Sequence, residues 1–148
     1  KKRNTVETGL HQDRIYWTNR ERSATLFSVW IALEDMTFDK GGIMFSEETR
    51  VAIDDMNRFN SGLLYEHIEV KTAPGGFPLV IADPLASRLK QSIHCVELKK
   101  GEAIAFDSFE PHMSGENTQN LPRLAMKIAY CEGQKRTRYL TKIEQFKD

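Results

Sequence analysis

A pair formed by a histidine and a carboxylate near the start of the chain, together with a second histidine far along it, places the strongest constraint on how this sequence folds. His11 and Asp13 stand two residues apart, whereas His112 lies near the other end of the chain. On a strand, residues i and i+2 point to the same face, so the H-x-D pair suits an extended segment. If the three side chains act together, a distant strand carrying His112 has to fold alongside that segment.

These three residue types predict a metal centre. Two histidines and one carboxylate are the ligands of non-haem Fe(II) sites that keep coordination positions open. Similar sets also bind zinc in hydrolases, so the ligand types alone do not choose the metal. Arg123 follows His112 in the sequence, and its forked, permanent cation matches a carboxylate in charge and geometry. The four residues together predict a metal with a carboxylate-bearing organic acid bound beside it.

Composition sets the broad class of the protein. A chain of 148 residues with 40% hydrophobic and 28% charged residues suits one globular domain with a real core. Its 21 Lys and Arg balance 21 Asp and Glu, which argues against a nucleic-acid partner held by bulk charge. No stretch approaches the roughly 20 apolar residues that span a bilayer, so we expect no membrane partner. Cys95 and Cys131 are expected to be buried free thiols, consistent with a cytoplasmic location.

The apolar segments are short and are separated by glycine and proline, which predicts a mainly β fold. We expect the long apolar segment 24–36 to form a central strand, and Ser46 to cap a helix over 47–59. The pattern favours a double-stranded β-helix, that is, a jelly-roll or cupin-like barrel with little helix. Further strands are expected at 43–45, near 68–71 and 79–82, at 93–98 and 103–106 as a hairpin-like pair, at 124–130 and at 139–143.

An ordered series of motifs supports this interpretation. It comprises His11-Gln12-Asp13, Val29–Thr37, Lys40–Ile43, Gly101–Phe106, Pro111–Thr118 and Pro122-Arg123. The series resembles the phytanoyl-CoA dioxygenase family of Fe(II)/2-oxoglutarate-dependent oxygenases over about residues 9–46 and 97–131. One departure is Ser46–Thr49, where that family usually has P-G-S-H.

The resemblance implies a role for each site residue. His11, Asp13 and His112 would bind Fe(II), Arg123 would hold the far carboxylate of the cosubstrate 2-oxoglutarate, and Ser114 and Trp30 would also contact that cosubstrate. The implied reaction is hydroxylation of a small or lipid-like metabolite. The carboxylate of Asp13 favours hydroxylation over halogenation, because related halogenases have a small residue there.

Other interpretations remain open. The sequence predicts one domain over residues 1–148 that lacks the N-terminal part usual in this family. The first alternative is therefore a metal-binding jelly-roll module without turnover, and the second is a purely structural or partner-binding domain. We also expect self-association into a homo-oligomer through an open sheet edge, with the apolar strand Leu26–Leu33 as the candidate.

Overall fold

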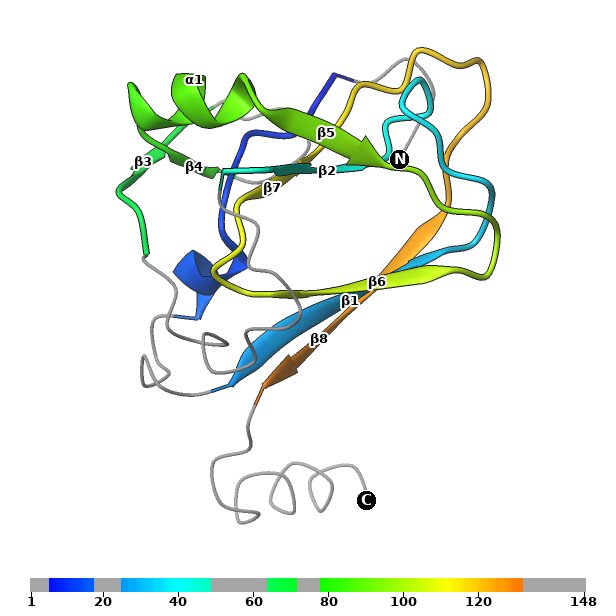
Figure 1. Ribbon diagram of the computed structural model, residues 1–148, viewed down its shortest axis with the longest axis horizontal. Helices are drawn as coiled ribbons and strands as arrows, with labels where there is room; N and C mark the ends of the chain where they lie inside the picture. The colour runs from blue at the N-terminus through cyan, green and yellow to red at the C-terminus, as the bar shows by residue number, and fades with distance from the viewer. Residues whose placement is uncertain (1–5, 18–24, 49–63, 72–77, 132–148) are drawn as a thin grey trace, which may run out of the picture.

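The computed structural model describes residues 6–17, 25–48, 64–71 and 78–131 (Figure 1). Within these ranges the chain forms mostly short strands with very little helix. The elements are, in chain order, the 3-10 turn η1 (Asp13–Tyr16), β1 (Leu26–Ala32), β2 (Ile43–Ser46), β3 (His67–Glu69), β4 (Leu79–Ile81), α1 (Leu85–Lys90), β5 (Ile93–Val96), β6 (Ala103–Asp107), β7 (His112–Ser114) and β8 (Ala125–Cys131).

β1 is the centre of an antiparallel sheet with the strand order β6-β1-β8. Alternate residues of β1 are buried, as the period of two along a strand requires when one face meets the core. The buried positions are Leu26, Ser28, Trp30 and Ala32. Phe106 of β6 lies opposite Ser28, and Lys127 of β8 lies opposite Trp30, so both share this inward face.

The second sheet has the order β5-β2-β7 and is covered on both faces, which explains why all four residues of β2 are buried. Ile43 and Phe45 face the first sheet and pack with its Trp30 and Phe106. The opposite face, marked by Met44, lies against the β3–β4 hairpin and α1 (Figure 1). Burying a large apolar side chain stabilises the fold by about 1.5–3 kcal/mol, so this inter-sheet cluster contributes substantially to holding the sheets together.

The mainly β, jelly-roll prediction is confirmed, although the described sheets do not close into a barrel (Figure 1). The expected strands at 24–36, 43–45 and 124–130 correspond to β1, β2 and β8, and those near 68–71 and 79–82 to β3 and β4. The expected helix at 47–59 lies mostly outside the described residues, and the expected strand at 139–143 lies wholly outside them. No described helix is long and apolar enough to cross a membrane.

Two expectations about strand pairing were wrong. β5 and β6 do not form a hairpin, because β5 pairs with β2 and β6 pairs with β1 in the other sheet. Val96 and Ile104 each pack against the inter-sheet cluster from opposite sides, so the chain crosses between the sheets at residues 97–102. The segment Leu26–Leu33 is not a free edge either, because β1 is paired on both sides, and the outer strands of this sheet among the described residues are β6 and β8.

The short helix α1 was not expected from the sequence. It lies in the segment 60–92, which the glycine and proline content marked as irregular. Asp83 stabilises its first turn, because its Oδ1 accepts hydrogen bonds from the backbone N (3.0 Å) and the Oγ (2.7 Å) of Ser87. A carboxylate that satisfies an N–H of the first turn is the usual device for beginning a helix.

Candidate metal centre

Backbone pairing brings the two histidines together from opposite ends of the described chain. His11 N donates to the carbonyl oxygen of His112 at 3.0 Å, and His112 N donates to that of His11 at 2.9 Å. This reciprocal pair is an isolated antiparallel bridge at the start of β7. It places the two imidazole rings with their centroids 4.4 Å apart.

Asp13 joins them from the first residue of η1. Gln12 between the two motif residues is extended (φ −111°, ψ 130°), so His11 and Asp13 project to the same side as predicted. The predicted strand itself is wrong, because the chain turns into a 3-10 conformation at Asp13. The turn is anchored by Arg14 N, which donates to the carbonyl oxygen of Ser108 at 2.9 Å.

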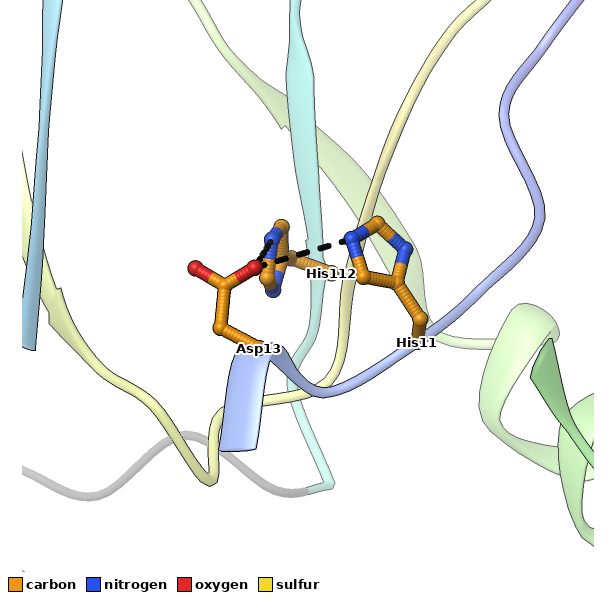
Figure 2. A group of neighbouring side chains, drawn as sticks. All are labelled: His11, Asp13 and His112. Atoms are coloured by element: carbon orange, nitrogen blue, oxygen red, sulfur yellow. Dashed lines mark ion pairs between the residues drawn. The ribbon is translucent and has the colours of Figure 1, made fainter. Parts of the chain in front are cut away.

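The three side chains converge as a ligand set (Figure 2). The distance from Asp13 Oδ1 is 3.8 Å to His11 Nε2 and 3.5 Å to His112 Nε2, and the three ligand atoms lie within 4.8 Å of one another. Ligand atoms bound at right angles to one ion at about 2.1 Å stand ~3 Å apart. The observed spacings are longer than that value, so the three side chains would have to draw closer together to hold one ion.

The tautomers of both histidines are fixed by the backbone. His11 Nδ1 lies 2.8 Å from the carbonyl oxygen of Gly9, and His112 Nδ1 lies 2.9 Å from that of Glu110. A carbonyl only accepts, so each Nδ1 carries a proton, and each Nε2 is the ring nitrogen that faces Asp13 and is placed to ligate a metal. Histidines that ligate metals are commonly held in this way by their other nitrogen. Glu110 thus contacts His112 through its main-chain carbonyl.

Burial sets the charge of His11, and contacts with neighbouring side chains set the charge of Asp13. Burial first, and then the charge of His112, lowers the pKa of His11 to about 3 from an ordinary 6.5. Burial alone would raise the pKa of Asp13, but its hydrogen bond to His112 and the neighbouring charges of His112 and Lys127 outweigh it and hold that pKa well below its ordinary value. At neutral pH the site therefore presents a neutral His11 and an ionised Asp13, the protonation states that metal binding requires.

Two residues that the motif analysis did not single out hold the Asp13 carboxylate. Ser28 Oγ, buried on the inward face of β1, donates to Asp13 Oδ2 at 2.6 Å. Lys127 Nζ, from the same face of β8, lies 2.5 Å from each carboxylate oxygen. Inward-facing polar residues in apolar strands were the available signal, since Ser28 alternates with Leu26 and Trp30.

Gln12, the middle residue of the motif, ties the site to its surroundings. Its side chain is fully buried; Oε1 accepts from Tyr65 N at 2.8 Å, and Nε2 donates to the carbonyl oxygen of Phe109 at 2.5 Å. The first bond reaches the segment before β3, and the second reaches the loop that leads to His112. Gln12 therefore fixes the turn between two ligands against both neighbouring segments.

Arg123 and Trp30 lie against each other in the space between the two large sheets. The Arg123 guanidinium stands 4.9 Å from the centroid of the Trp30 ring and donates through Nη1 to the carbonyl oxygen of Gly41 at 2.5 Å. Burial lowers the pKa of Arg123 to about 10, so it stays charged at neutral pH. Gly41 adopts φ 71°, and an added Cβ would lie 2.6 Å from the carbonyl oxygen of Gly115. Only glycine therefore suits the position whose carbonyl oxygen accepts from Arg123.

Aromatic packing connects the Arg123 pair to the histidines. Trp30, Phe45 and Phe106 belong to one buried cluster, and the rings of Phe106 and Phe45 lie 4.6 Å and 6.0 Å from that of His112. Ser114 follows His112 by two residues on β7 and lies opposite Ile43, on the same inward face. The structure thus brings the predicted site residues to one inter-sheet space, while their roles stay predictions.

The loop that carries Arg123 is ordered by Asn117. Asn117 is fully buried, its Nδ2 donates to the carbonyl oxygen of Leu121 at 3.0 Å, and its Oδ1 accepts from Gln119 N at 3.1 Å. Cys95 and Cys131 form no disulfide among the described residues, and both are half-buried, so the expectation that they are buried was wrong.

Known proteins similar to this chain include one protein family and several solved structures. The family model described as phytanoyl-CoA dioxygenase (PhyH) matches residues 1–125. The structure of EvdO2 from Micromonospora carbonacea var. aurantiaca complexed with 2-oxoglutarate is 18% identical with a TM-score of 0.65, and the match covers 90% of this chain and 49% of that one. A comparison with curated proteins finds no match.

Two further solved structures are similar at the same level of identity. EctD from S. alaskensis with 2-oxoglutarate and 5-hydroxyectoine is 18% identical with a TM-score of 0.58, covering 87% of this chain and 40% of its own. The epimerase SnoN in complex with Fe3+, alpha ketoglutarate and nogalamycin RO is 18% identical with a TM-score of 0.58, covering 89% and 44%. These likenesses show the fold, and the chain spans about half the length of these proteins or less.

Proposed function

The chain belongs to the phytanoyl-CoA dioxygenase family, and from that premise we propose that it forms an Fe(II)- and 2-oxoglutarate-dependent oxygenase centre. The main observation behind this proposal is that His11, Asp13 and His112 are buried together, with their potential ligand atoms within 4.8 Å of one another. The donor set fits Fe(II), because two neutral imidazoles and one carboxylate leave positions for a chelating oxo acid and dioxygen. The 2-oxoglutarate and iron bound in similar folds support the same choice.

Each protein group has a defined task in this proposal. His11, Asp13 and His112 hold the metal, and the metal with its oxo acid supplies the oxidation of a C–H bond to an alcohol. Arg123 pairs with the distal carboxylate of 2-oxoglutarate, Trp30 packs beside that pair, and Ser114 contributes a hydroxyl from the same face as His112. The aromatic cluster around His112 keeps bulk water from this side of the centre.

The substrate of the proposed reaction is a small or lipid-like metabolite, and the carboxylate at Asp13 favours hydroxylation. We place the protein in the cytoplasm, as its free cysteines suggest. We also propose that it self-associates through β6 or β8, the outer strands of the first sheet among the residues that the structure describes. A sedimentation series that finds only monomer up to high concentration would contradict the last point.

A second candidate is a metal-binding module without turnover, and one observation favours it. The two large sheets do not close into a barrel over the residues that the structure describes. An open inter-sheet space holds a reactive centre away from water less completely than a closed one. In that case the ligands would still bind metal, but no oxo acid would be consumed.

One experiment separates the two functions. The purified chain is titrated with Fe(II) and then with 2-oxoglutarate without oxygen, and succinate is measured after oxygen is admitted. Tight metal binding with 2-oxoglutarate binding and succinate formation is the expected result. Metal binding with no affinity for 2-oxoglutarate would favour the module, and no metal binding by a folded protein would refute both. An Asp13→Ala variant serves as the control that lacks one ligand.

A further inference from the structure

Lys127 is a second cation beside the candidate metal centre, where it contacts the carboxylate of Asp13. Its Nζ lies 2.5 Å from both oxygens of the Asp13 carboxylate. The side chain is 30% exposed, and Nζ stands 5.9 Å from the centroid of the Phe106 ring. A lysine placed on an inward sheet face carries a desolvation cost, so its position there calls for an anionic ligand or a structural partner.

Lys127 and Arg123 bracket a short aromatic surface. Lys127 is the cross-strand neighbour of Trp30, and the Arg123 guanidinium lies against the ring of that same tryptophan. Arg123 lies two residues before the first residue of β8, the strand that carries Lys127. The arrangement therefore has one cation at the metal ligand Asp13, a second cation further along the sheet, and aromatic side chains between them.

This pattern matches the charge distribution of a 2-oxo dicarboxylic acid, which has an anionic group at each end and two methylenes between. Resting on the proposed function, we propose that Lys127 binds the carboxylate of 2-oxoglutarate that lies next to the oxo group, at the metal end. An ammonium that touches both oxygens of a metal-ligating carboxylate is within reach of an anionic oxygen bound next to it. Arg123 takes the other end.

Charge balance agrees with this assignment. A divalent ion bound by the three ligands, together with Lys127 and Arg123, would outweigh the single carboxylate of Asp13 and give the centre a net positive charge. A dianionic ligand compensates most of that charge in a partly dry space, where unbalanced charge is costly. Ser28 continues to hold Oδ2 of Asp13 when Lys127 turns toward the ligand.

The test compares two oxo acids in two variants. Lys127→Met keeps the length of the side chain and removes the charge, and Arg123→Met does the same at the other end. Binding of 2-oxoglutarate and of pyruvate, which lacks the distal carboxylate, is measured by calorimetry on the Fe(II)-loaded protein without oxygen. Lys99→Met is the control, since Lys99 is an exposed lysine 3.6 Å from Asp35 and remote from the site.

Each substitution is expected to weaken binding of only one end of the oxo acid. Lys127→Met weakens 2-oxoglutarate and pyruvate by the same factor, about tenfold for a partly exposed charged hydrogen bond, while Arg123→Met weakens 2-oxoglutarate alone. Lys127 also contacts Asp13, so oxo-acid binding is compared at saturating Fe(II) for each variant, and saturable Fe(II) binding by Lys127→Met reports that it is folded. Unchanged 2-oxoglutarate affinity in Lys127→Met, or a loss confined to 2-oxoglutarate, would overturn the assignment while leaving the proposed function in place. A parent that binds Fe(II) but no oxo acid would refute the proposed function itself.

Discussion

The hydrogen bond from Ser28 to Asp13 provides a sharp test of how the metal ligand is held. Ser28 is 1% exposed, its Oγ lies 2.6 Å from Oδ2 of Asp13, and it does not touch the ligand oxygen Oδ1 directed at the histidines. Ser28→Ala therefore removes one donor without changing any proposed ligand. It leaves in place Lys127, which contacts both oxygens of the carboxylate.

The size of the effect follows from the charge of the acceptor. A hydrogen bond to a charged group contributes about 1.5–3 kcal/mol, and Asp13 is ionised because its contacts with His112 and Lys127 lower its pKa despite burial. Lys127 still contacts both oxygens, so the low end of this range applies. At ~1.4 kcal/mol per decade, Fe(II) affinity should fall about tenfold, in line with the ~10–100-fold cost of losing a partner that orients a metal ligand.

The assay is an anaerobic calorimetric titration of Ser28→Ala and the parent with Fe(II), repeated with Mn(II). Ser46→Ala is the matched control, because Ser46 is also a fully buried strand serine, but its Oγ pairs with Ser92 Oγ at 2.9 Å, away from the ligands. Both variants should lose some stability, and only Ser28→Ala should lose metal affinity. If the folded Ser28→Ala protein binds Fe(II) as tightly as the parent, the idea that this bond orients Asp13 is refuted.

Three further predictions follow from the site. His112→Ala should lower Fe(II) affinity more than Ser28→Ala does, beyond about 100-fold, because it removes a ligand; full affinity in the titration would exclude His112 as one. The free energy of unfolding should fall as pH drops from 6.5 toward 3, because burial holds the pKa of His11 at about 3 and the unfolded chain therefore binds more protons. Chemical denaturation at pH 7 and pH 4 should show a smaller loss of this free energy in His11→Asn than in the parent. Equal losses in the two proteins would contradict this. Arg123→Met should weaken 2-oxoglutarate binding roughly 30-fold, with Arg123→Lys between it and the parent and Fe(II) affinity unchanged; parent-like affinity for 2-oxoglutarate in Arg123→Met would remove its role.

The ligand set could be predicted because it depends on residue type and on a local rule. The i, i+2 relation between His11 and Asp13 requires only that Gln12 be extended, and Gln12 is extended even though no regular strand continues through Asp13. The strand assignments succeeded where apolar periodicity is strong, as in β1. Where both faces are buried, as in β2, the sequence shows an apolar run, and its length and the flanking Gly41-Gly42 identify it as a strand.

The errors arise where long-range contacts decide the structure. The crossing between β5 and β6 looks like a hairpin locally, because Gly101 and its neighbours form a turn in which Glu102 N donates to the carbonyl oxygen of Lys99. Only the burial of Val96 and Ile104 from opposite sides of one cluster separates the two strands into different sheets. The supporting roles of Ser28 and Lys127 were missed for a similar reason, since each becomes visible only when β1 and β8 are in register.

The register of β1 and β8 also explains why one small region of the sheet can serve both ends of a ligand. Trp30 pairs with Lys127 in that register, and Ser28 stands one step along the same face of β1. Asp13 enters this face from η1 and is held there by Ser28 and Lys127, while the bridge between His11 and His112 fixes the imidazoles from the facing sheet. A shift of one residue in either strand would turn Ser28 or Lys127 to the outer face. The pairing that builds the core of the fold is therefore the same pairing that sets the charge and the orientation of the metal ligand.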